Sequence, residues 1–260
     1  MKFPGLSGQL PLLRLRGWMV LPTLLLALLL QGCATVRNPD PRDPLESLNR
    51  SVFSFNEAVD RAVLKPVAKG YQAITPDFVR TGIGNFFSNL ADVWSAVNNG
   101  LQGRGQEVGD SVGRVMVNSS IGILGLLDVA SDLNIERHPA NFGQTLGRWG
   151  VPPGPFLVLP LFGPYTLREI AALPVDVQGD LKNRLGDQNV NLVLPILNVI
   201  NLRSKYLNTG DVIQGASLDS YLFQRDAYLQ RQRNIQYDGN PPDEAYDAND
   251  ANDANDDQKP

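Results

Sequence analysis

Cysteine and histidine are almost missing from this 260-residue chain, which contains one of each, Cys33 and His138. A single cysteine excludes an internal disulfide and any cysteine-based metal cluster. A Ser-His-Asp or Cys-His nucleophile would depend on His138 alone, and the proline that follows it favours a turn. The sequence also lacks a G-x-S-x-G elbow, a P-loop and a dinucleotide fingerprint. We therefore predict that the protein is not an enzyme and binds no metal or dissociable cofactor.

Basic residues are not in excess. The chain has 23 lysines and arginines against 27 acidic residues, for a formal net charge of -4, so we expect no nucleic-acid partner. Much of the negative charge lies in "DANDANDANDD" near the C-terminus, a stretch with almost no apolar side chain to bury. This composition predicts a disordered acidic tail over residues 238–260. A calcium site is the alternative, but the loop glycine and terminal glutamate of an EF-hand are missing.

A long hydrophobic run is missing as well. The apolar stretch over residues 18–30 is shorter than the roughly 20 residues that span a bilayer, but it fits the h-region of a secretory signal peptide. It ends in "LQGC", which resembles the lipobox of bacterial lipoproteins. We predict a signal peptide over residues 1–32, and a covalent diacylglycerol and N-acyl lipid on Cys33. An ordinary signal peptide that contains a cysteine is the alternative.

The residues after the cysteine predict where the protein is held. Residues 33–42 are polar and contain proline, which is typical of a short tether between the lipid and a folded domain over residues 43–237. Ala34, and not aspartate, follows the cysteine. In the lipoproteins that the motif resembles, this argues against retention in the inner membrane. We expect a lipid anchor in the bacterial outer membrane, on its periplasmic side.

Helical periodicity dominates residues 43–237 and predicts an all-α fold. The first helix is expected to begin with Asp43 as N-cap, Pro44 in the first turn and Glu46 in a capping box, and to stop or kink at Pro66. A second helix is predicted over residues 75–103 and a last one over residues 217–237. The second carries an apolar stripe at three- and four-residue spacing, made of Phe78, Phe86, Leu90, Val93, Val97 and Leu101.

Two segments have unusual composition. Gly105, Gly109 and Gly113 recur at four-residue spacing, which would let a neighbouring backbone approach closely, or would mark a loop or a tight helix crossing. The stretch "VPPGPFLVLPLFGP", residues 151–164, has five prolines among apolar side chains. Repeated proline disfavours a helix interior and a central strand, so we predict an irregular backbone here. Its side chains either line the core or form an apolar surface at a membrane or a lipid tail.

Several motifs together resemble one known family. They run in order from Asp43 to Arg231 and include "DPLESLNRSVFSFNEAVD", "PDFVRTGIGNFFSNLADVWSAVNNGLQG", "IGILGLLDVAS", "NFGQTLGRWGVPPGPFLVLPLFGPYTLRE" and "DAYLQRQ". These stretches resemble the MlaA lipoproteins, also called VacJ. Ala140 and Asn141 depart from the acidic residues often seen before the "FG" pair.

The resemblance implies both a fold and a function. It implies a ring-like helical domain embedded in the inner leaflet of the outer membrane and held beside a porin trimer. It also implies that the protein takes mislocalised phospholipid from the outer leaflet and passes it to a periplasmic carrier of the MlaC type, which maintains lipid asymmetry. A structural lipoprotein that docks on a porin or the envelope and moves no lipid is the alternative, and a lipid hydrolase dependent on His138 is a weaker one.

A channel for phospholipid needs an apolar edge for the tails and a polar wall for the headgroup. The candidates for the lipid path or its gate are Phe55, Phe86, Phe87, Trp94, Phe156, Leu157, Leu161 and Phe162. The candidates for the polar wall are Asn85, Asn89, Asn98, Arg114 and Asn118. Buried polar pairs between helices have the same sequence pattern, so this second group has two interpretations.

Overall fold

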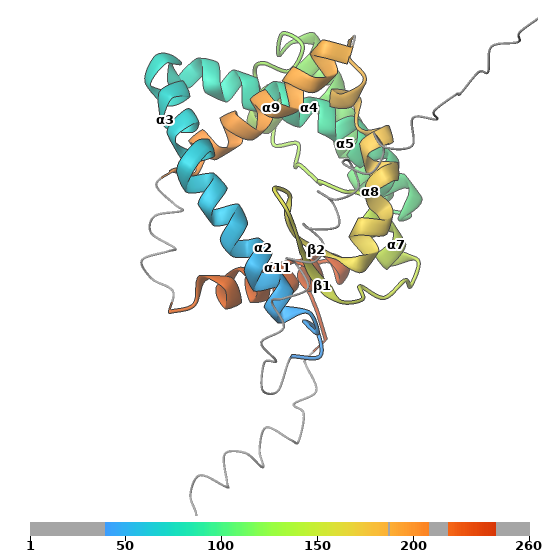
Figure 1. The fold of residues 1–260 in the computed structure, drawn as a ribbon. Helices are drawn as coiled ribbons and strands as arrows, with labels where there is room; N and C mark the ends of the chain where they lie inside the picture. The colour runs from blue at the N-terminus through green and yellow to red at the C-terminus, as the bar shows by residue number, and fades with distance from the viewer. Residues whose placement is uncertain (1–39, 187, 208–217, 243–260) are drawn as a thin grey trace, which may run out of the picture.

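The computed structural model describes residues 40–186, 188–207 and 218–242. The expected signal peptide, the lipidation site at Cys33 and residues 243–260 of the acidic tail lie outside them. Helices make up most of the described chain and follow one another around a ring (Figure 1). The α-helices are α2 (Glu46–Val59), α3 (Lys65–Ile74), α4 (Asp77–Leu101), α5 (Gly105–Ser120), α6 (Val129–Asp132), α7 (Phe142–Arg148), α8 (Leu167–Gly179), α9 (Gln188–Lys205) and α11 (Ser220–Gln236).

Contacts between distant parts of the sequence close the ring. Helix α3 packs on α9, α4 packs on both α5 and α9, and α11 packs on α7. A short 3₁₀-helix, η2 (Leu181–Asn183), lies between α8 and α9 and contacts α4. The predicted second and last helices are confirmed, with α4 and α11 ending within a few residues of the expected bounds. None of the helices in the described ranges is long and apolar enough to cross a membrane.

A β-hairpin corrects the all-α prediction. Strands β1 (Phe156–Leu159) and β2 (Gly163–Thr166) pair antiparallel, with Phe156 opposite Thr166, and the hairpin points into the middle of the ring in Figure 1. The prediction of an irregular backbone over residues 151–164 is confirmed for residues 151–155 and was wrong from Phe156 onward, where the hairpin forms. In a two-stranded sheet each strand has an outer edge with no neighbouring strand. Pro164 can therefore occupy β2, because the N–H that proline lacks would have had no strand to bond with on that outer edge. Residues 160–162 form the turn, and Leu161 in it and Gly163 at the start of β2 are both at positive φ.

The first helix does not stop at Pro66. A π-helical turn, η1 (Asp60–Leu64), joins α2 to α3, and the backbone N–H of Lys65 donates to the carbonyl of Asp60, five residues earlier. Proline has no backbone N–H to donate. The wider turn places Pro66 in the first turn of α3, where a backbone N–H is not needed for the hydrogen bonds of the α-helix. The chain therefore stays helical from α2 through α3.

Asp43 is not the N-cap that the sequence predicted. Helix α2 begins at Glu46 after Leu45, and the Asp43 side chain is fully buried. It accepts hydrogen bonds from the Asn49 amide (2.8 Å) and from the Tyr221 hydroxyl on α11. The carboxylate thus joins the start of the domain to its last helix.

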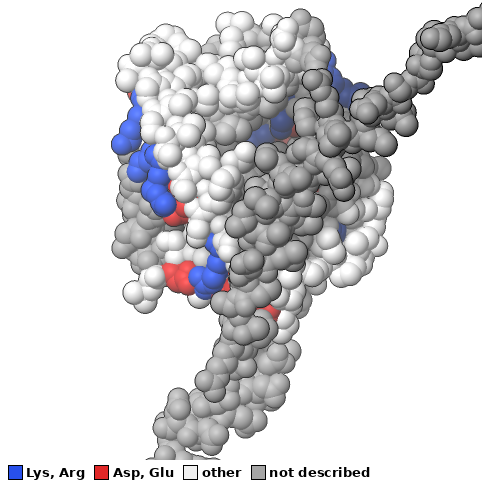
Figure 2. All heavy atoms as spheres, in the orientation of Figure 1, with Lys and Arg blue, Asp and Glu red and all other residues white. Residues whose placement is uncertain are grey.

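Apolar and polar side chains are distributed in an unusual way. In α4, the apolar stripe includes exposed positions (Phe78 is 78% exposed), whereas Asn89, Asp92 and Asn98 lie on the buried face. The pattern recurs in α9, where Asn201 and Ser204 are buried and the exposed apolar side chains are Val190, Leu192, Val193, Ile196, Val199 and Leu202. In Figure 2, uncharged residues make up most of the surface over the upper part of the molecule. Much of the helix packing is therefore polar, and much of the outside is apolar.

The glycines of α5 do not make the expected close contacts. They lie in a regular helix, which excludes a loop, but a Cβ placed on Gly105 or Gly109 would meet no atom within 4 Å. At Gly113 the nearest atom would be 3.9 Å away. Helix α5 instead packs on α4 through its polar residues Ser111, Arg114 and Asn118, which are buried.

Candidate functional site

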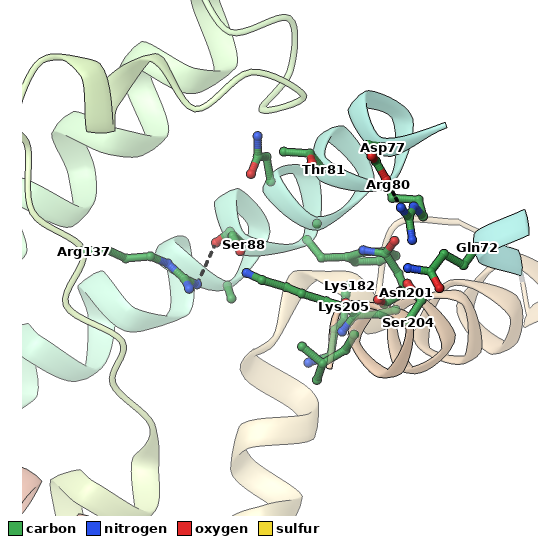
Figure 3. A pocket seen from close by; sticks show the side chains of 16 residues that line it. Gln72, Asp77, Arg80, Thr81, Ser88, Arg137, Lys182, Asn201, Ser204 and Lys205 are labelled. Carbon is green, nitrogen blue, oxygen red and sulfur yellow. Dashed lines mark hydrogen bonds and ion pairs between the residues drawn. The ribbon is translucent and has the colours of Figure 1, made fainter. Parts of the chain in front are cut away.

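A cavity of about 510 Å³ is bounded by α4, α9 and η2. Four cationic side chains line it, and we call it the basic pocket. They are Arg80 from the start of α4, Arg137 from the segment between α6 and α7, Lys182 from η2 and Lys205 from the end of α9. Figure 3 shows these side chains gathered on one side of α4.

Three of the four cations are paired with carboxylates. Arg80 pairs with Asp77, whose side chain is 89% exposed. Lys182 lies 2.5 Å from Asp180, which is itself largely buried. Arg137 Nε donates to Asp92 at 2.7 Å, and its Nη2 donates to the Ser88 carbonyl at 3.3 Å. The salt bridges in the described ranges do not include Lys205.

The uncharged lining of the basic pocket is rich in hydrogen-bonding groups. It includes the amides of Gln72, Asn85, Asn198 and Asn201 and the hydroxyls of Thr81, Ser88 and Ser204. Phe87 and Leu202 add apolar contacts. Charged donors with amides and hydroxyls around them suit an anionic, oxygen-rich group such as a phosphate ester. Phe87 and Leu202 would contact the apolar part of such a ligand.

Of the predicted polar wall, Asn85 alone lines the basic pocket, and its amide donates to the Leu126 carbonyl at 3.2 Å. The other four lie in the packing between helices, which is the second interpretation left open by the sequence. Asn89 donates to Ser119, and Asn98 accepts from Thr145. They join α4 to neighbouring helices and do not face the cavity.

Arg114 and Asn118 belong to a buried network on α5. Arg114 contacts Asp92 (3.3 Å) and Asp128 (2.7 Å), and Asn118 donates to the same Asp128. Partial burial opposes ionisation of Asp128, but hydrogen bonds from Ser131, Asn118 and Arg114 outweigh it and lower the pKa of this carboxyl. Asp92 also binds Arg137, so the network reaches the basic pocket through one carboxylate.

Three of the predicted path residues are exposed and lie in two segments that contact each other. Phe55 on α2 is 51% exposed, and Leu161 and Phe162 in the hairpin turn are 69% exposed. The side chain of Asn56 holds these segments together, because its amide donates to the Leu159 carbonyl (3.0 Å) and its oxygen accepts from the Leu161 N–H (2.7 Å). We call residues 160–162 the hairpin tip.

The remaining path candidates are buried or half-buried. Phe156 is 1% exposed and packs edge-to-face on Tyr221 and Tyr228 in the core. Its neighbour Leu157 is half-buried and pairs with Tyr165 in the hairpin. In this structure neither position opens onto the basic pocket.

The aromatic candidates of α4 lie around the same helix. Phe87 is buried, lines the basic pocket and packs edge-to-face on Phe86. Trp94 Nε1 donates to Asp176 on α8 at 2.7 Å, and its indole lies so close to Gly179 that an added Cβ there would clash at 2.5 Å. Trp94 therefore joins α4 to α8.

The sequence reasoning missed the four cations and Asn56. Arg80, Arg137, Lys182 and Lys205 are scattered singly along the sequence and belong to no motif, so only the closure of the ring brings them together. His138 was considered, but it does not line the basic pocket, and its Nε2 lies 3.0 Å from an Asp110 carboxylate oxygen. Among the described residues, no group of three or more His, Cys, Asp or Glu side chains is placed to hold a metal ion.

The structure defines a class of protein: a ring of helices with polar packing between them, many exposed apolar side chains and a basic pocket. The model of the MlaA lipoprotein family matches residues 41–235. The chain belongs to the MlaA lipoprotein family, and the resemblance seen in its sequence is confirmed.

Named relatives and a solved structure support this membership. The chain is 34% identical over 215 residues to the intermembrane phospholipid transport system lipoprotein MlaA of Shigella flexneri, covering 78% of this chain and 82% of the relative. The protein of the same name from Escherichia coli is 33% identical with the same coverage. A solved structure described as the structural basis for maintenance of bacterial outer membrane lipid asymmetry aligns with a TM-score of 0.63 and 33% identity, over 75% of this chain and 98% of the other.

Proposed function

We propose that this protein removes mislocalised phospholipid from the outer leaflet of the outer membrane and passes it to a periplasmic carrier. The observation that carries the proposal is the family match over residues 41–235, with relatives named as intermembrane phospholipid transport lipoproteins. The alternative of an envelope lipoprotein that moves no lipid is not favoured by these relatives.

The distribution of polar and apolar side chains supports a place at the membrane. A domain in contact with acyl chains has to satisfy its polar groups internally and present apolar side chains outward. Exposed Ile74 and Phe78, at the junction of α3 and α4, and the apolar face of α9 fit that requirement. We propose that these exposed apolar side chains embed in the inner leaflet and that the lipid on Cys33 anchors the chain there. We also propose that a porin trimer and an MlaC-type carrier are the partners of the protein.

The basic pocket and the hairpin tip fit the two ends of a phospholipid. The pocket offers cations and hydrogen-bonding groups for a headgroup, and the exposed Phe55, Leu161 and Phe162 offer apolar contacts for tails. We propose that transport is passive and makes no covalent bond, with the affinity of the downstream carrier supplying the free energy. Nucleotide hydrolysis by the purified protein would contradict this mechanism.

The test compares outer-leaflet phospholipid in cells that lack the protein and in the same cells complemented with it. Access of an added phospholipase to phospholipid on intact cells is one readout. We expect a rise on deletion that the intact protein reverses, and no reversal by Cys33→Ala, because that variant would be folded but mislocalised. Unchanged outer-leaflet phospholipid on deletion would favour the envelope lipoprotein that moves no lipid.

A further inference from the structure

The charges around the basic pocket do not balance. Arg80, Arg137 and Lys182 each pair with a carboxylate, whereas the described ranges contain no ion pair for Lys205. The pocket with its paired carboxylates therefore has one cation in excess. A bound group with a single negative charge would neutralise this excess.

One hydrogen-bond donor at the pocket is also unused. The Nε atom of Arg80 is buried and has no hydrogen-bond partner in the described part of the chain. A buried donor without a partner costs free energy, and a ligand oxygen would recover it where binding turns this atom toward the pocket. This Nε atom belongs to a guanidinium that lines the pocket, and a guanidinium binds well to an anionic acceptor such as a phosphate oxygen.

The remaining lining suits hydroxyl groups better than an ammonium group. Amides and hydroxyls both donate and accept, so they can bond a polyol from either side, whereas an ammonium only donates and prefers carboxylates. Among the described residues that line the pocket, the one carboxylate is Asp77, which is largely exposed and already paired with Arg80. An ammonium inside the pocket would lie among like charges.

We propose that the basic pocket selects phospholipids with an anionic, hydroxyl-bearing headgroup, such as phosphatidylglycerol, over zwitterionic ones such as phosphatidylethanolamine. This inference rests on the phospholipid-transport function proposed above. Both headgroups present a phosphate, but the second adds a positive charge that the pocket does not match. The expected preference is about fivefold in affinity, the upper end of the range for one partly exposed charge pair.

The test uses the full-length lipidated protein in detergent with phospholipids that share the same acyl chains and differ in headgroup. Bound lipid is measured by native mass spectrometry under direct competition. We expect a ratio of about five in favour of phosphatidylglycerol in the unmodified protein. Lys205→Gln, and Arg80→Gln as an independent second variant, should each bring the ratio toward one. Lys69→Gln, at an exposed position of α3 outside the pocket lining, is the matched control and should leave it unchanged.

The outcomes separate this inference from the function on which it rests. Equal binding of both phospholipids would overturn the headgroup preference and leave the transport proposal intact. Binding of neither would contradict the transport proposal itself. Free glycerol 1-phosphate is the probe for a soluble anion: we expect weak competition, and competition as strong as that of the lipid would overturn the assignment to a lipid headgroup.

Discussion

Replacing Asn49 with alanine should destabilise the domain strongly, because this one side chain joins α2 to the hairpin. Asn49 is 1% exposed. Its amide donates to the Phe156 carbonyl (3.0 Å) and to Asp43 (2.8 Å), and its oxygen accepts from the Val158 N–H (2.9 Å). The side-chain amide thus pairs with the outer edge of β1 as a neighbouring strand would, where β2 cannot reach.

The magnitude follows from the groups that would lose this partner. Asn49→Ala removes three hydrogen bonds from buried groups, and each buried polar group left without a partner costs roughly 1–3 kcal/mol. Partial relaxation of the hairpin reduces the sum, so we expect a loss of about 3–5 kcal/mol in the free energy of unfolding. For a domain of this size, that corresponds to a fall in Tm of roughly 10 °C.

The assay is thermal and urea unfolding of the full-length protein in detergent, followed by far-ultraviolet circular dichroism. Asn234→Ala is the matched control, because Asn234 lies exposed on α11 and the same substitution should change stability by less than about 0.5 kcal/mol. If Asn49→Ala unfolds like this control, the Asn49 amide does not hold the strand edge and the reasoning is refuted.

Three further predictions test the buried network and the hairpin tip. Asp92→Asn removes the carboxylate that Arg114 and Arg137 share, and should cost about 3 kcal/mol in urea unfolding; a loss below about 1 kcal/mol would contradict the network. Because the pKa of Asp128 is lowered in the folded state, its contribution to stability is present above the unfolded pKa near 3.8 and is lost as pH falls through the lower folded pKa. The stability of Asp128→Asn should therefore fall less steeply below about pH 4 than that of the unmodified protein, and parallel pH profiles would count against the shift. Asn56→Ala frees the hairpin tip from α2 and should change outer-leaflet phospholipid in complemented cells at normal protein abundance; wild-type behaviour would remove the tip from the transport path.

Local patterns predicted the helices well, because three- and four-residue apolar spacing reflects helical geometry whether the apolar face meets core or lipid. The same patterns failed where tertiary contacts overrode a local rule. Asp43 has the sequence context of an N-cap, but its partners are Asn49 inside the helix and Tyr221, which is far along the chain. Pro66 has the context of a helix end, but a π-turn accommodates it. The hairpin was not predicted because its segment is rich in proline, which disfavours a central strand. An isolated two-stranded sheet has only edge strands, and edge strands tolerate proline.

The candidate site was harder to predict than the fold. Phe55 and Leu161 were proposed as path residues after the family resemblance had been recognised, and the proline-rich apolar composition of residues 151–164 had already marked the segment that holds Leu161. The structure shows both side chains exposed, and their place on a lipid path stays a prediction. The cations were missed, because a charge such as Lys205 at the end of a helix is ordinary until the ring brings it beside Arg80 and Arg137. Residues four apart on a helix lie on the same face, but this spacing does not tell which of them faces a cavity. Asn85 on α4 lines the basic pocket, whereas Asn89 on the same helix bonds to α5.

The buried network also explains how a pocket can stay shaped in a domain with little apolar core. Helices α4 and α5 meet through polar side chains, and the chain of contacts from Asp128 through Arg114 and Asp92 ends at Arg137 in the pocket wall. Each charged group in this series of contacts has a partner of opposite charge. Moving Arg137 away would leave the buried Asp92 carboxylate with one cation fewer, which would cost free energy. Apolar packing of the same helices would hold them together without fixing the position of a guanidinium. The polar interior therefore leaves the apolar side chains free for the outside of the ring and holds one pocket cation in place, the two properties that the proposed passage of a phospholipid requires.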